Sequence, residues 1–424
     1  MAESLLEKIL SRENMNLSIK RVKANKGSHG VDGRSIEETY KYLKDHSMEI
    51  GKALREGTYK VQPVRRVEIP KSDGGVRLLG IPTVLDRIIQ QAIMQVISPI
   101  FDRDFSKNSY GFRPGKSARQ AVLQAREYIS MGYTWVVDID LEKFFDRVNH
   151  DILMSRVARK IKDKRVLKLI RQYLNAGVMI NGVVLSSYEG TPQGGNLSPL
   201  LANIILDDLD KELERRGHKF CRYADDCNIY VKSRKAGERV MNNISEFIEK
   251  ELKLKVNRNK SAVDKPIRRR FLGFSFYYKS DKTIGIRVDK KSVKRLKKNV
   301  KKSTGRSNGK SIQDKIKDLN YKTIGWINYF SIADIKTLCR ELDKWIRRRL
   351  RMCMWKQWKR IKTRHDNLIK LGIDNYEAWE WANTRKGYWR VSNSCILAVT
   401  LTNKVLEGMG FVSLTNRLKL VKSF

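Results

Sequence analysis

The sequence has no long apolar run, and its N-terminus has no basic region followed by an apolar core. We therefore expect neither a membrane-spanning helix nor a signal peptide. The five cysteines are an odd number and widely scattered, and no two form a C-x-x-C pair, so neither a disulfide framework nor a zinc ribbon is indicated. These absences predict a protein of the reducing cytoplasm.

Acidic residues are scarce relative to basic ones. Asp and Glu number 46 against 87 Lys and Arg, which gives a net charge of +41 and a pI near 10.1. Hydrophobic residues at 41% and aromatic residues at 9% indicate a folded chain and not a disordered basic tail. Its 424 residues suffice for two to four domains. The charge predicts a polyanionic partner, most commonly nucleic acid, with an anionic membrane surface as the rival.

Two of the few acidic stretches adjoin β-prone runs. The stretch Tyr223–Asp226 predicts a tight turn between two short strands. The run from Trp135 is typical of a buried strand, and its period of two places Asp138 and Asp140 on one face. Neighbouring carboxylates repel each other and lose water, which a divalent cation such as Mg²⁺ would offset. A plain surface turn is the alternative, and strand geometry permits either Asp138 or Asp140 as a ligand.

Two further segments are suited to binding phosphate. Residues 59–82 predict a hairpin that turns at Asp73-Gly74-Gly75. Lys71 and Arg77 flank this turn at an even spacing, so both can converge on one anion, although a solvated basic hairpin is the alternative. Residues 190–197 form a Gly-rich loop before a helix, whose N-terminal amides could face a phosphate or a base. That signal is weak alone, because such loops are common.

Helical patterns extend along most of the remaining chain. They predict helices over 86–101, from Ser117, and over 151–175, 236–252, 290–302, 314–329 and 338–361, with a second hairpin at 178–188. From about residue 285 the composition becomes more basic. Within 338–361, basic residues alternate with tryptophans, a pattern that suits phosphate contact and base stacking but is equally typical of a helical core. We assign only the charge of this segment to nucleic-acid binding.

Several motifs occur in the order that is typical of one family. They are Asp140 with Phe145 and Asp146, Thr191-Pro192-Gln193-Gly194, Tyr223-Ala224-Asp225-Asp226, Asn257 with Lys260, and Phe271-Leu272-Gly273-Phe274. Together they resemble the motifs of reverse transcriptases. Residues 110–114 (YGFRP) and 325–330 (GWINYF), with the basic helix that follows, are similar to those of the bacterial group II intron reverse transcriptase/maturases. The resemblance runs from about residue 30 to beyond residue 400.

This resemblance implies an α+β fold of the right-hand polymerase type. The N-terminal extension and fingers would occupy 1–100, and a palm with an antiparallel sheet backed by helices would occupy 101–284. The palm would include interleaved fingers helices and a helical insertion near 151–188. A helical thumb or maturase domain would follow over 285–362, and a small helical DNA-binding domain over 363–424. Because the sequence has five histidines and no C-x-x-C pair, we expect the compact subclass without an endonuclease domain.

The resemblance also implies the roles of individual site residues. Two Mg²⁺ ions, which Mn²⁺ can replace, would be held by Asp140, Asp225, Asp226 and the Ile139 carbonyl, with Asp140 preferred over Asp138 by its spacing to Phe145. The implied nucleotide contacts are Lys71 and Arg77 at the triphosphate, Gln193 in the pocket and Phe145 beneath the sugar. Lys260 would protonate the leaving pyrophosphate, although a plain surface lysine is the alternative.

The implied partners are group II intron RNA as template and splicing substrate, a DNA target and primer, and dNTPs, with no membrane. Nucleic-acid contacts are expected at Arg113, Lys297, Lys298, Arg347, Arg348, Arg351, Lys356 and Lys359. The expected function is RNA-directed DNA polymerase with a second role in intron splicing and mobility, in the bacterial cytoplasm and at the nucleoid when acting on DNA. One alternative is an RNA-binding splicing factor on a retired polymerase scaffold. Another is a reverse transcriptase of a retron, a diversity-generating element or an immune system.

Overall fold

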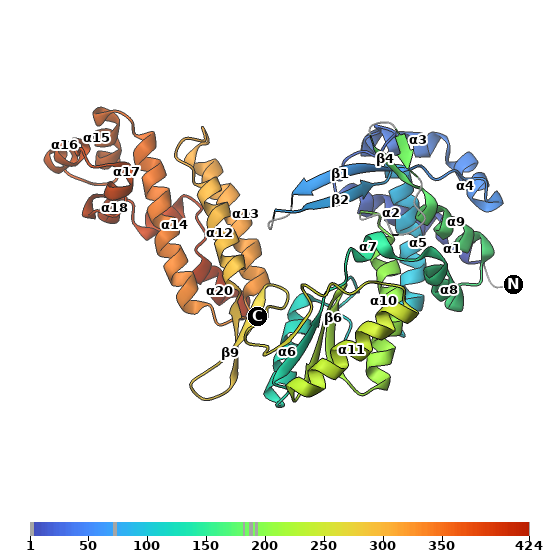
Figure 1. The fold of residues 1–424 in the computed structure, drawn as a ribbon. Helices are drawn as coiled ribbons and strands as arrows, with labels where there is room; N and C mark the ends of the chain where they lie inside the picture. Colours follow the sequence, from blue (N-terminus) through green and yellow to red (C-terminus); the bar gives the residue numbers. More distant parts are fainter. Residues whose placement is uncertain (1–3, 71–73, 181–182, 186–189, 191–193, 424) are drawn as a thin grey trace. The chain divides into compact units, whose positions relative to one another are not determined.

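The computed structural model describes residues 4–70, 74–180, 183–185, 190 and 194–423 (Figure 1). The chain divides into two units, Met1–Lys265 and Pro266–Phe424, and each is described by itself. This division is coarser than the four segments expected from the sequence, so the finer boundaries stay a prediction. No helix among the described residues is long and apolar enough to cross a membrane.

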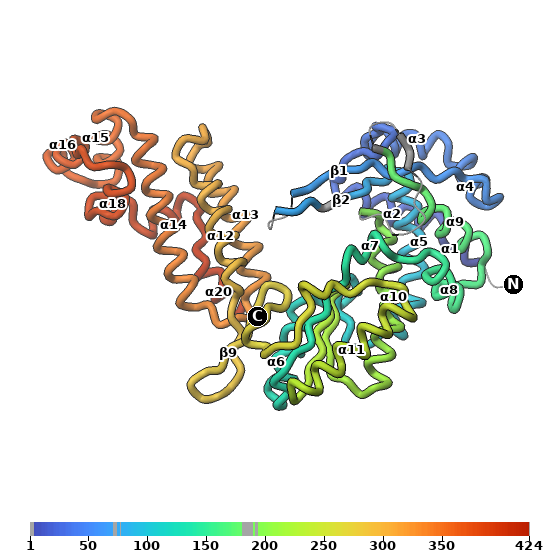
Figure 2. The backbone as a smooth tube through the Cα atoms, viewed as in Figure 1, coloured from blue at the N-terminus to red at the C-terminus, as the bar shows by residue number. Residues whose placement is uncertain are grey.

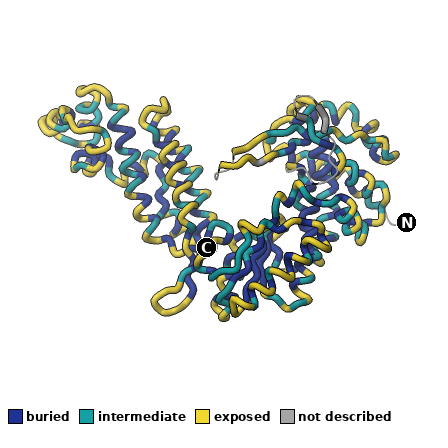
Figure 3. The backbone as a smooth tube through the Cα atoms, in the orientation of Figure 1, coloured by how far each residue is buried: buried dark blue, intermediate teal, exposed yellow. Residues whose placement is uncertain are grey.

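A four-stranded antiparallel sheet lies at the centre of the first unit. Its strands are β6 (Lys219–Tyr223), β7 (Asp226–Val231), β3 (Trp135–Ile139) and β8 (Ala262–Asp264), in the order β6-β7-β3-β8. These strands form because each alternates residues between two covered faces, and they are largely buried (Figure 3). The sheet matches the antiparallel palm expected from the sequence.

Helices cover both faces of this sheet. On one face, Val137 and Val231 contact α11 (Arg234–Glu251), where a Cβ added to Gly237 would clash with Val263. Helix α10 (Ser198–Arg215) lies on the same face, and Arg222 of β6 binds it through buried hydrogen bonds. On the opposite face Tyr230 meets Tyr128 of α6 (Ala118–Ser130), with ring centroids 5.7 Å apart. Figure 2 shows the sheet between α6 on one side and α10 and α11 on the other.

A second sheet carries the predicted basic hairpin. Strands β1 (Val64–Pro70) and β2 (Val76–Ile81) pair antiparallel, which confirms the hairpin expected over 59–82. Strands β4 (Val178–Ile180) and β5 (Val183–Leu185) form the other predicted hairpin, and β4 joins β1 in parallel. The long helix α5 (Val84–Asp102) follows β2 and buries its apolar stripe in the core.

The remaining helices of the first unit pack around α5 and the central sheet. They are α1 (Leu5–Leu10), α2 (Arg12–Ala24), α3 (Ile36–Asp45), α4 (Ser47–Glu56), α7 (Phe144–Arg147), α8 (His150–Lys160) and α9 (Lys164–Asn175). Their starts follow local capping chemistry. Ser35, for example, forms a reciprocal capping box with Glu38 at the start of α3. The helices predicted over 86–101 and 236–252 are confirmed with shifts of one or two residues at their ends. The helical stretch predicted over 151–175 is also confirmed, but as two helices, α8 and α9, that are separated at 161–163.

The second unit is mainly helical. A hairpin of β9 (Phe274–Tyr278) and β10 (Ile284–Val288) precedes the helices. The helices are α12 (Lys290–Ser303), α13 (Ile312–Phe330), α14 (Lys336–Gln357), α15 (Ile361–Lys370), α16 (Asn375–Ala382), α17 (Tyr388–Val391), α18 (Cys395–Thr400), α19 (Asn403–Gly408) and α20 (Leu414–Lys422).

One predicted helix is shorter than expected. The helix expected to run to Ile361 ends at Gln357, and Ile361 begins a new helix with 45% of its surface exposed. The break is stabilised by Arg364, whose Nε donates to the carbonyl of Trp358 at 3.0 Å. Trp355 is fully buried, so this tryptophan belongs to the core, which was one of the two interpretations of the pattern.

Candidate active site

The paired aspartates lie at a two-residue hairpin turn, Asp225 within the loop and Asp226 at the start of β7. Tyr223 of β6 pairs with Asp226 of β7, so Ala224 and Asp225 form the loop between them, as the sequence predicted. Ala224 has φ +56° and is 5% exposed. A left-handed conformation costs an L-residue with a Cβ about 1–2 kcal/mol. The turn must therefore be held by its surroundings.

Arg222 provides much of that support. Its side chain is fully buried, and Nη1 donates to the carbonyl of Ala224 at 2.9 Å and to Asn203 Oδ1 at 3.0 Å. Its Nε and Nη2 donate to the two carboxylate oxygens of Asp210 on α10 at 2.7 and 2.5 Å. Burial raises the pKa of the Asp210 carboxyl, while the charge of Arg222 opposes that rise. This bidentate pair attaches the aspartate turn to the helix beneath it.

The YGFRP segment supports the same turn from another side. A Cβ added to Gly111 would lie 2.3 Å from the backbone nitrogen of Ala224, so only glycine allows this approach. Tyr110 N–H donates to the carbonyl of Arg222 at 2.8 Å, and Asn203 Nδ2 donates to the carbonyl of Gly111 at 2.9 Å. The ring of Phe112 lies 6.3 Å from that of Tyr223. The motif thus acts through backbone packing against the carboxylate turn.

Arg113 does not face outward as a nucleic-acid contact would. Its side chain is 6% exposed, and Nε donates to the carboxylate of Asp102 at 2.6 Å. Its other nitrogens donate to the carbonyls of Ser106, Ser109 and Asp102. Because these bonds occupy the guanidinium inside the protein, we correct its expected role: it orders the loop before Tyr110 and is not part of the nucleic-acid surface.

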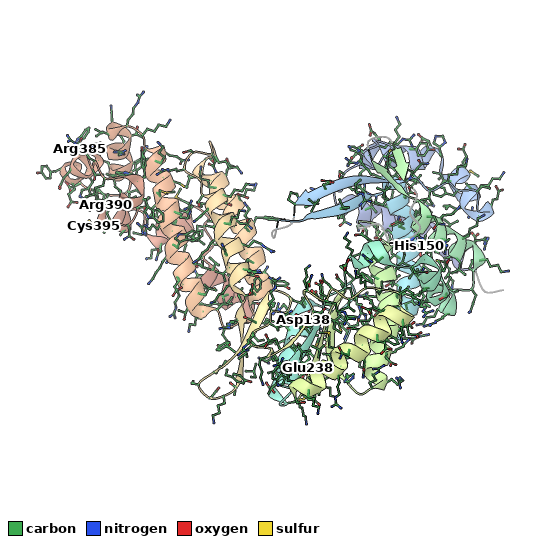
Figure 4. All side chains as sticks on the ribbon, viewed as in Figure 1. Asp138, His150, Glu238, Arg385, Arg390 and Cys395 are labelled. Atoms are coloured by element: carbon green, nitrogen blue, oxygen red, sulfur yellow. The ribbon has the colours of Figure 1, made fainter. Side chains whose placement is uncertain are left out.

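Asp140 comes to the same end of the sheet as the turn. Ile139 pairs with Cys227, so the next residues in register are Asp140 and Asp226. Facing residues of antiparallel strands have Cα atoms about 4.5–5.5 Å apart. Asp138 lies further back, inside the ladder opposite Asn228 (Figure 4). The sheet thus brings Asp140, more than Asp138, to the aspartate turn.

The backbone of Asp140 is held by the turn that carries the Asn257 and Lys260 motif, together with Ser261, which the sequence did not single out. Asp140 N–H donates to Ser261 Oγ at 3.0 Å, and Asn257 N–H donates to the carbonyl of Asp140 at 2.8 Å. Lys260 N–H in turn donates to the carbonyl of Asn257 at 3.1 Å. This places Lys260, whose side chain is exposed, in the turn bound to Asp140. Ser261 was missed because a serine after a lysine carries no signal until this contact is seen.

The residues present fit a divalent metal by their donor chemistry. Asp140 and Asp225 are half-buried and Asp226 is exposed, and all three carry oxygen donors at one end of one sheet. In the described residues, no three Asp, Glu, His or Cys side chains already converge as a metal-binding group. Carboxylates repel each other without a cation between them, so an oxygen-only set at one strand end suits a hard cation such as Mg²⁺.

The two adjacent phenylalanines have different environments. Phe144 is 3% exposed and belongs to the core, whereas Phe145 is half-buried, with ring centroids 5.0 Å apart and ring planes at 72°. The backbone of Phe145 and Asp146 packs against Gly190, where an added Cβ would lie 2.9 Å from the Phe145 carbonyl oxygen. Phe145 is therefore the ring with a surface to offer a nucleotide.

Part of the predicted nucleotide site lies outside the described residues. Lys71 and Gln193 lie outside the described residues, and so does the side chain of Arg77. The backbone of Arg77 pairs with Ile69 in the basic hairpin. Gly195, two residues after Gln193, packs against Gln90, where an added Cβ would lie 2.8 Å from its side-chain oxygen. The loop after 193 is thus attached to α5.

The predicted basic contacts of the second unit fall into two groups. Lys297, Lys298 and Lys359 are exposed, and Arg347 is half-buried. The others contact the C-terminal helices. The guanidinium of Arg348 lies 3.9 Å from the Trp389 ring centroid, Arg351 Nε donates to the carbonyl of Leu401 at 2.9 Å, and the Lys356 ammonium lies 4.8 Å from the Tyr388 ring centroid. Neutralising this second group would disturb packing as well as charge.

Comparisons with known proteins match two segments of the chain to family models. The family described as reverse transcriptase (RNA-dependent DNA polymerase) matches residues 69–276, which include both carboxylate stretches. The group II intron, maturase-specific domain matches residues 293–372. Fold and site thus define an RNA-directed DNA polymerase. More particularly, the chain belongs to the group II intron reverse transcriptase/maturases.

The relatives fit this assignment. The chain is 35% identical over 280 residues to Protein YkfC of Escherichia coli (strain K12), covering 57% of this chain and 74% of that protein. It is 39% identical over 193 residues to the group II intron-encoded protein LtrA of Lactococcus lactis subsp. cremoris, covering 45% of this chain but 31% of that protein. A Cas6-RT-Cas1--Cas2 complex aligns over 96% of this chain and 49% of its own at TM-score 0.40 and 19% identity, a likeness too distant to inform the fold.

Proposed function

We propose that this protein copies group II intron RNA into DNA at the Asp140–Asp226 end of the central sheet and also binds that RNA to assist splicing and mobility. The observation that carries the proposal is the register that makes Asp140 and Asp226 the next pair after Ile139 and Cys227. The maturase-specific match over 293–372 supports the RNA-binding role. Its substrates would be an RNA template, a DNA primer and dNTPs, in the bacterial cytoplasm and at the nucleoid.

The chain's own residues would perform distinct tasks. Asp140, Asp225, Asp226 and the Ile139 carbonyl would hold two Mg²⁺ ions, which when bound stabilise the attacking and leaving oxygens of an in-line phosphoryl transfer. Phe145 would lie under the sugar and exclude a 2′-hydroxyl. Lys71 and Arg77 would neutralise the triphosphate, and Gln193 would line the nucleotide pocket.

Lys260 would protonate the pyrophosphate as it leaves. The turn that carries it is bonded to the Asp140 backbone, so a movement of one would move the other. Further along the chain, Lys297, Lys298, Arg347 and Lys359 would contact the nucleic-acid backbone as part of a thumb, with 363–424 forming a DNA-binding domain. Arg348, Arg351 and Lys356 would support that domain by packing and contribute charge.

Primer extension on an RNA template tests the proposal. Asp225→Asn with Asp226→Asn should abolish extension, and RNA binding in a filter assay should survive because affinity rests on distributed cations. Asp140→Asn should remove nearly all extension, while the matched Asp138→Asn should leave a readily measured fraction. Extension near the unaltered level in the Asp225/Asp226 variant would contradict the metal assignment, and greater damage from Asp138→Asn would contradict the register argument.

A further inference from the structure

A basic hollow of about 440 Å³ opens at the end of the central sheet opposite the carboxylates. Lys219 starts β6 and Val231 ends β7, whereas the aspartate turn joins the other ends of the same strands. A strand rises about 3.3–3.4 Å per residue, so the hollow is about 17 Å from Asp226 along β7. The side chains that define this basic hollow are Arg216, His218, Lys219, Lys232, Arg239 and Asn243.

Its charge is of one sign. None of the described residues that line the hollow is Asp or Glu, and in that part of the chain neither Lys219 nor Arg239 forms an ion pair. Glu238, next to Arg239, pairs instead with Arg234 at 2.8 Å (Figure 4). The Lys232 ammonium lies 5.6 Å from the Tyr133 ring centroid, a contact that orders the lysine without neutralising it.

One wall of the hollow is held in place by hydrogen bonds. Arg216 donates to Glu212 Oε1 at 2.6 Å and is 28% exposed. Hydrogen bonds from Arg215 and Arg216 lower the pKa of Glu212 to about 2, so the carboxylate stays ionised and holds Arg216 in place. Burial, aided by the charge of Arg216, lowers the pKa of the neighbouring His218.

We propose that the basic hollow binds the phosphodiester backbone of an RNA strand, separately from any strand held at the carboxylates. The inference rests on the proposed function, whose partner is a folded intron RNA that is large enough to contact both ends of the sheet. The maturase-specific match over 293–372 supports that partner. Lys219, Lys232 and Arg239 converge on a hollow that no described Asp or Glu lines, and such side chains suit phosphates. The hollow is open, so it suits a continuous strand better than an enclosed small anion.

Photo-crosslinking locates the contact with a matched pair of positions. Asn243 lines the hollow, whereas its exposed neighbour Asn242 does not, and adjacent helix positions point about 100° apart. A photoreactive amino acid is placed at either position of the full chain and irradiated with a long hairpin RNA or a DNA hairpin of the same sequence. We expect several-fold more RNA labelling from 243 than from 242. Equal labelling from both positions, or stronger labelling of the DNA hairpin, would overturn the proposal.

Salt dependence of binding provides the second measurement. The triple variant Lys219→Ala, Lys232→Ala and Arg239→Ala should lower the slope of log affinity against log salt for the hairpin RNA by roughly 2, since each lost phosphate contact contributes about 0.7–0.9. A control triple, Lys8→Ala, Arg119→Ala and Lys162→Ala, removes equal charge from exposed sites outside the hollow and should change the slope by much less. If the two triple variants changed the salt slope equally, the effect would come from the total charge of the protein and not from the hollow.

Two further readouts separate this proposal from its rival and from the proposed function. Polyglutamate should compete with the RNA poorly; competition as strong as that of RNA at equal charge would mean an acidic protein partner and would overturn the proposal. Primer extension on a short template–primer that reaches only the carboxylate end should be unchanged in both triples. If the unaltered protein does not extend the primer at all, the proposed polymerase function is wrong. If extension is normal but the salt slope of RNA binding is the same in the hollow triple as in the unaltered protein, only the proposal for the hollow is wrong.

Discussion

The Nε2 atom of His150 lies 2.7 Å from the carbonyl oxygen of Gly190. The ring is 2% exposed, and its Nδ1 lies 3.1 Å from Asn175 Oδ1 (Figure 4). Gly190 N–H also donates to the carbonyl of Val148 at 2.8 Å, and Gly190 packs on the backbone of Phe145. One buried imidazole therefore connects the start of α8, the end of α9 and the glycine that packs against the backbone of Phe145.

His150→Ala should leave the buried carbonyl of Gly190 without its partner and lower the free energy of unfolding by about 1–3 kcal/mol. Denaturant unfolding measures this. The control is His46→Ala, because the His46 side chain is 41% exposed and contacts Glu49 and the Tyr42 ring between α3 and α4. Its effect should stay within about 0.5 kcal/mol. An equal loss in the two variants would contradict the role assigned to the buried ring.

The Arg222–Asp210 pair should be sensitive to removal of one partner. Arg222→Met leaves the buried Asp210 carboxylate without its cation and should cost about 3–5 kcal/mol of stability. Because the Ala224 carbonyl also loses its donor, primer extension at temperatures where the fold persists should fall too. Arg234→Met breaks an exposed pair with Glu238 and should cost less than about 1 kcal/mol. Full extension by folded Arg222→Met would show that the turn does not depend on this arginine.

The two phenylalanines should separate selectivity from stability. Phe145→Ala should raise ribonucleotide incorporation relative to deoxyribonucleotides, because the half-buried ring would no longer exclude the 2′-hydroxyl. Phe144→Ala should instead lower stability by about 3–5 kcal/mol, as removal of a core ring does. Single-nucleotide kcat/KM for matched dNTP and NTP decides the first, and urea unfolding the second. An unchanged nucleotide ratio in Phe145→Ala would place the selectivity elsewhere.

The C-terminal helices should respond to pH through His365. Hydrogen bonds to Asp366 and Asn375 raise the pKa of this histidine, whose ring stacks on Trp379 at 4.1 Å. A raised folded-state pKa means that this stabilisation is fully present below the unfolded pKa near 6.5 and is lost as pH rises through the folded value.

Unfolding of the full chain, followed by tryptophan fluorescence from acidic to alkaline pH, measures this dependence. The difference in stability between the unaltered chain and His365→Gln should shrink as the pH rises from the unfolded pKa of histidine through the raised folded-state pKa. His46→Gln in the other unit is the matched control, because the exposed His46 also has a carboxylate neighbour, Glu49. A difference that grows with pH would contradict the direction assigned to the pKa shift.

The sequence by itself determined the chemistry and the local elements of this protein. Asp138 or Asp140, and Asp225 with Asp226, could be singled out because they lie in or beside β-prone runs, where side-chain alternation and turn preference act over a few residues. The preference for Asp140 over Asp138 came from the family resemblance and its spacing to Phe145. The hairpin at 64–81 and the helix over 84–102 were predictable for the same reason.

Only the tertiary structure decided which residues support that chemistry. The sequence does not separate the environments of Arg222 and Arg113 from those of other basic residues in a chain of net charge +41, yet one is buried against Asp210 and the other against Asp102. Ser261 reaches Asp140 across 121 positions. Such contacts depend on the burial and register that distant segments impose on each other, and those are properties of the packed chain and not of any stretch within it.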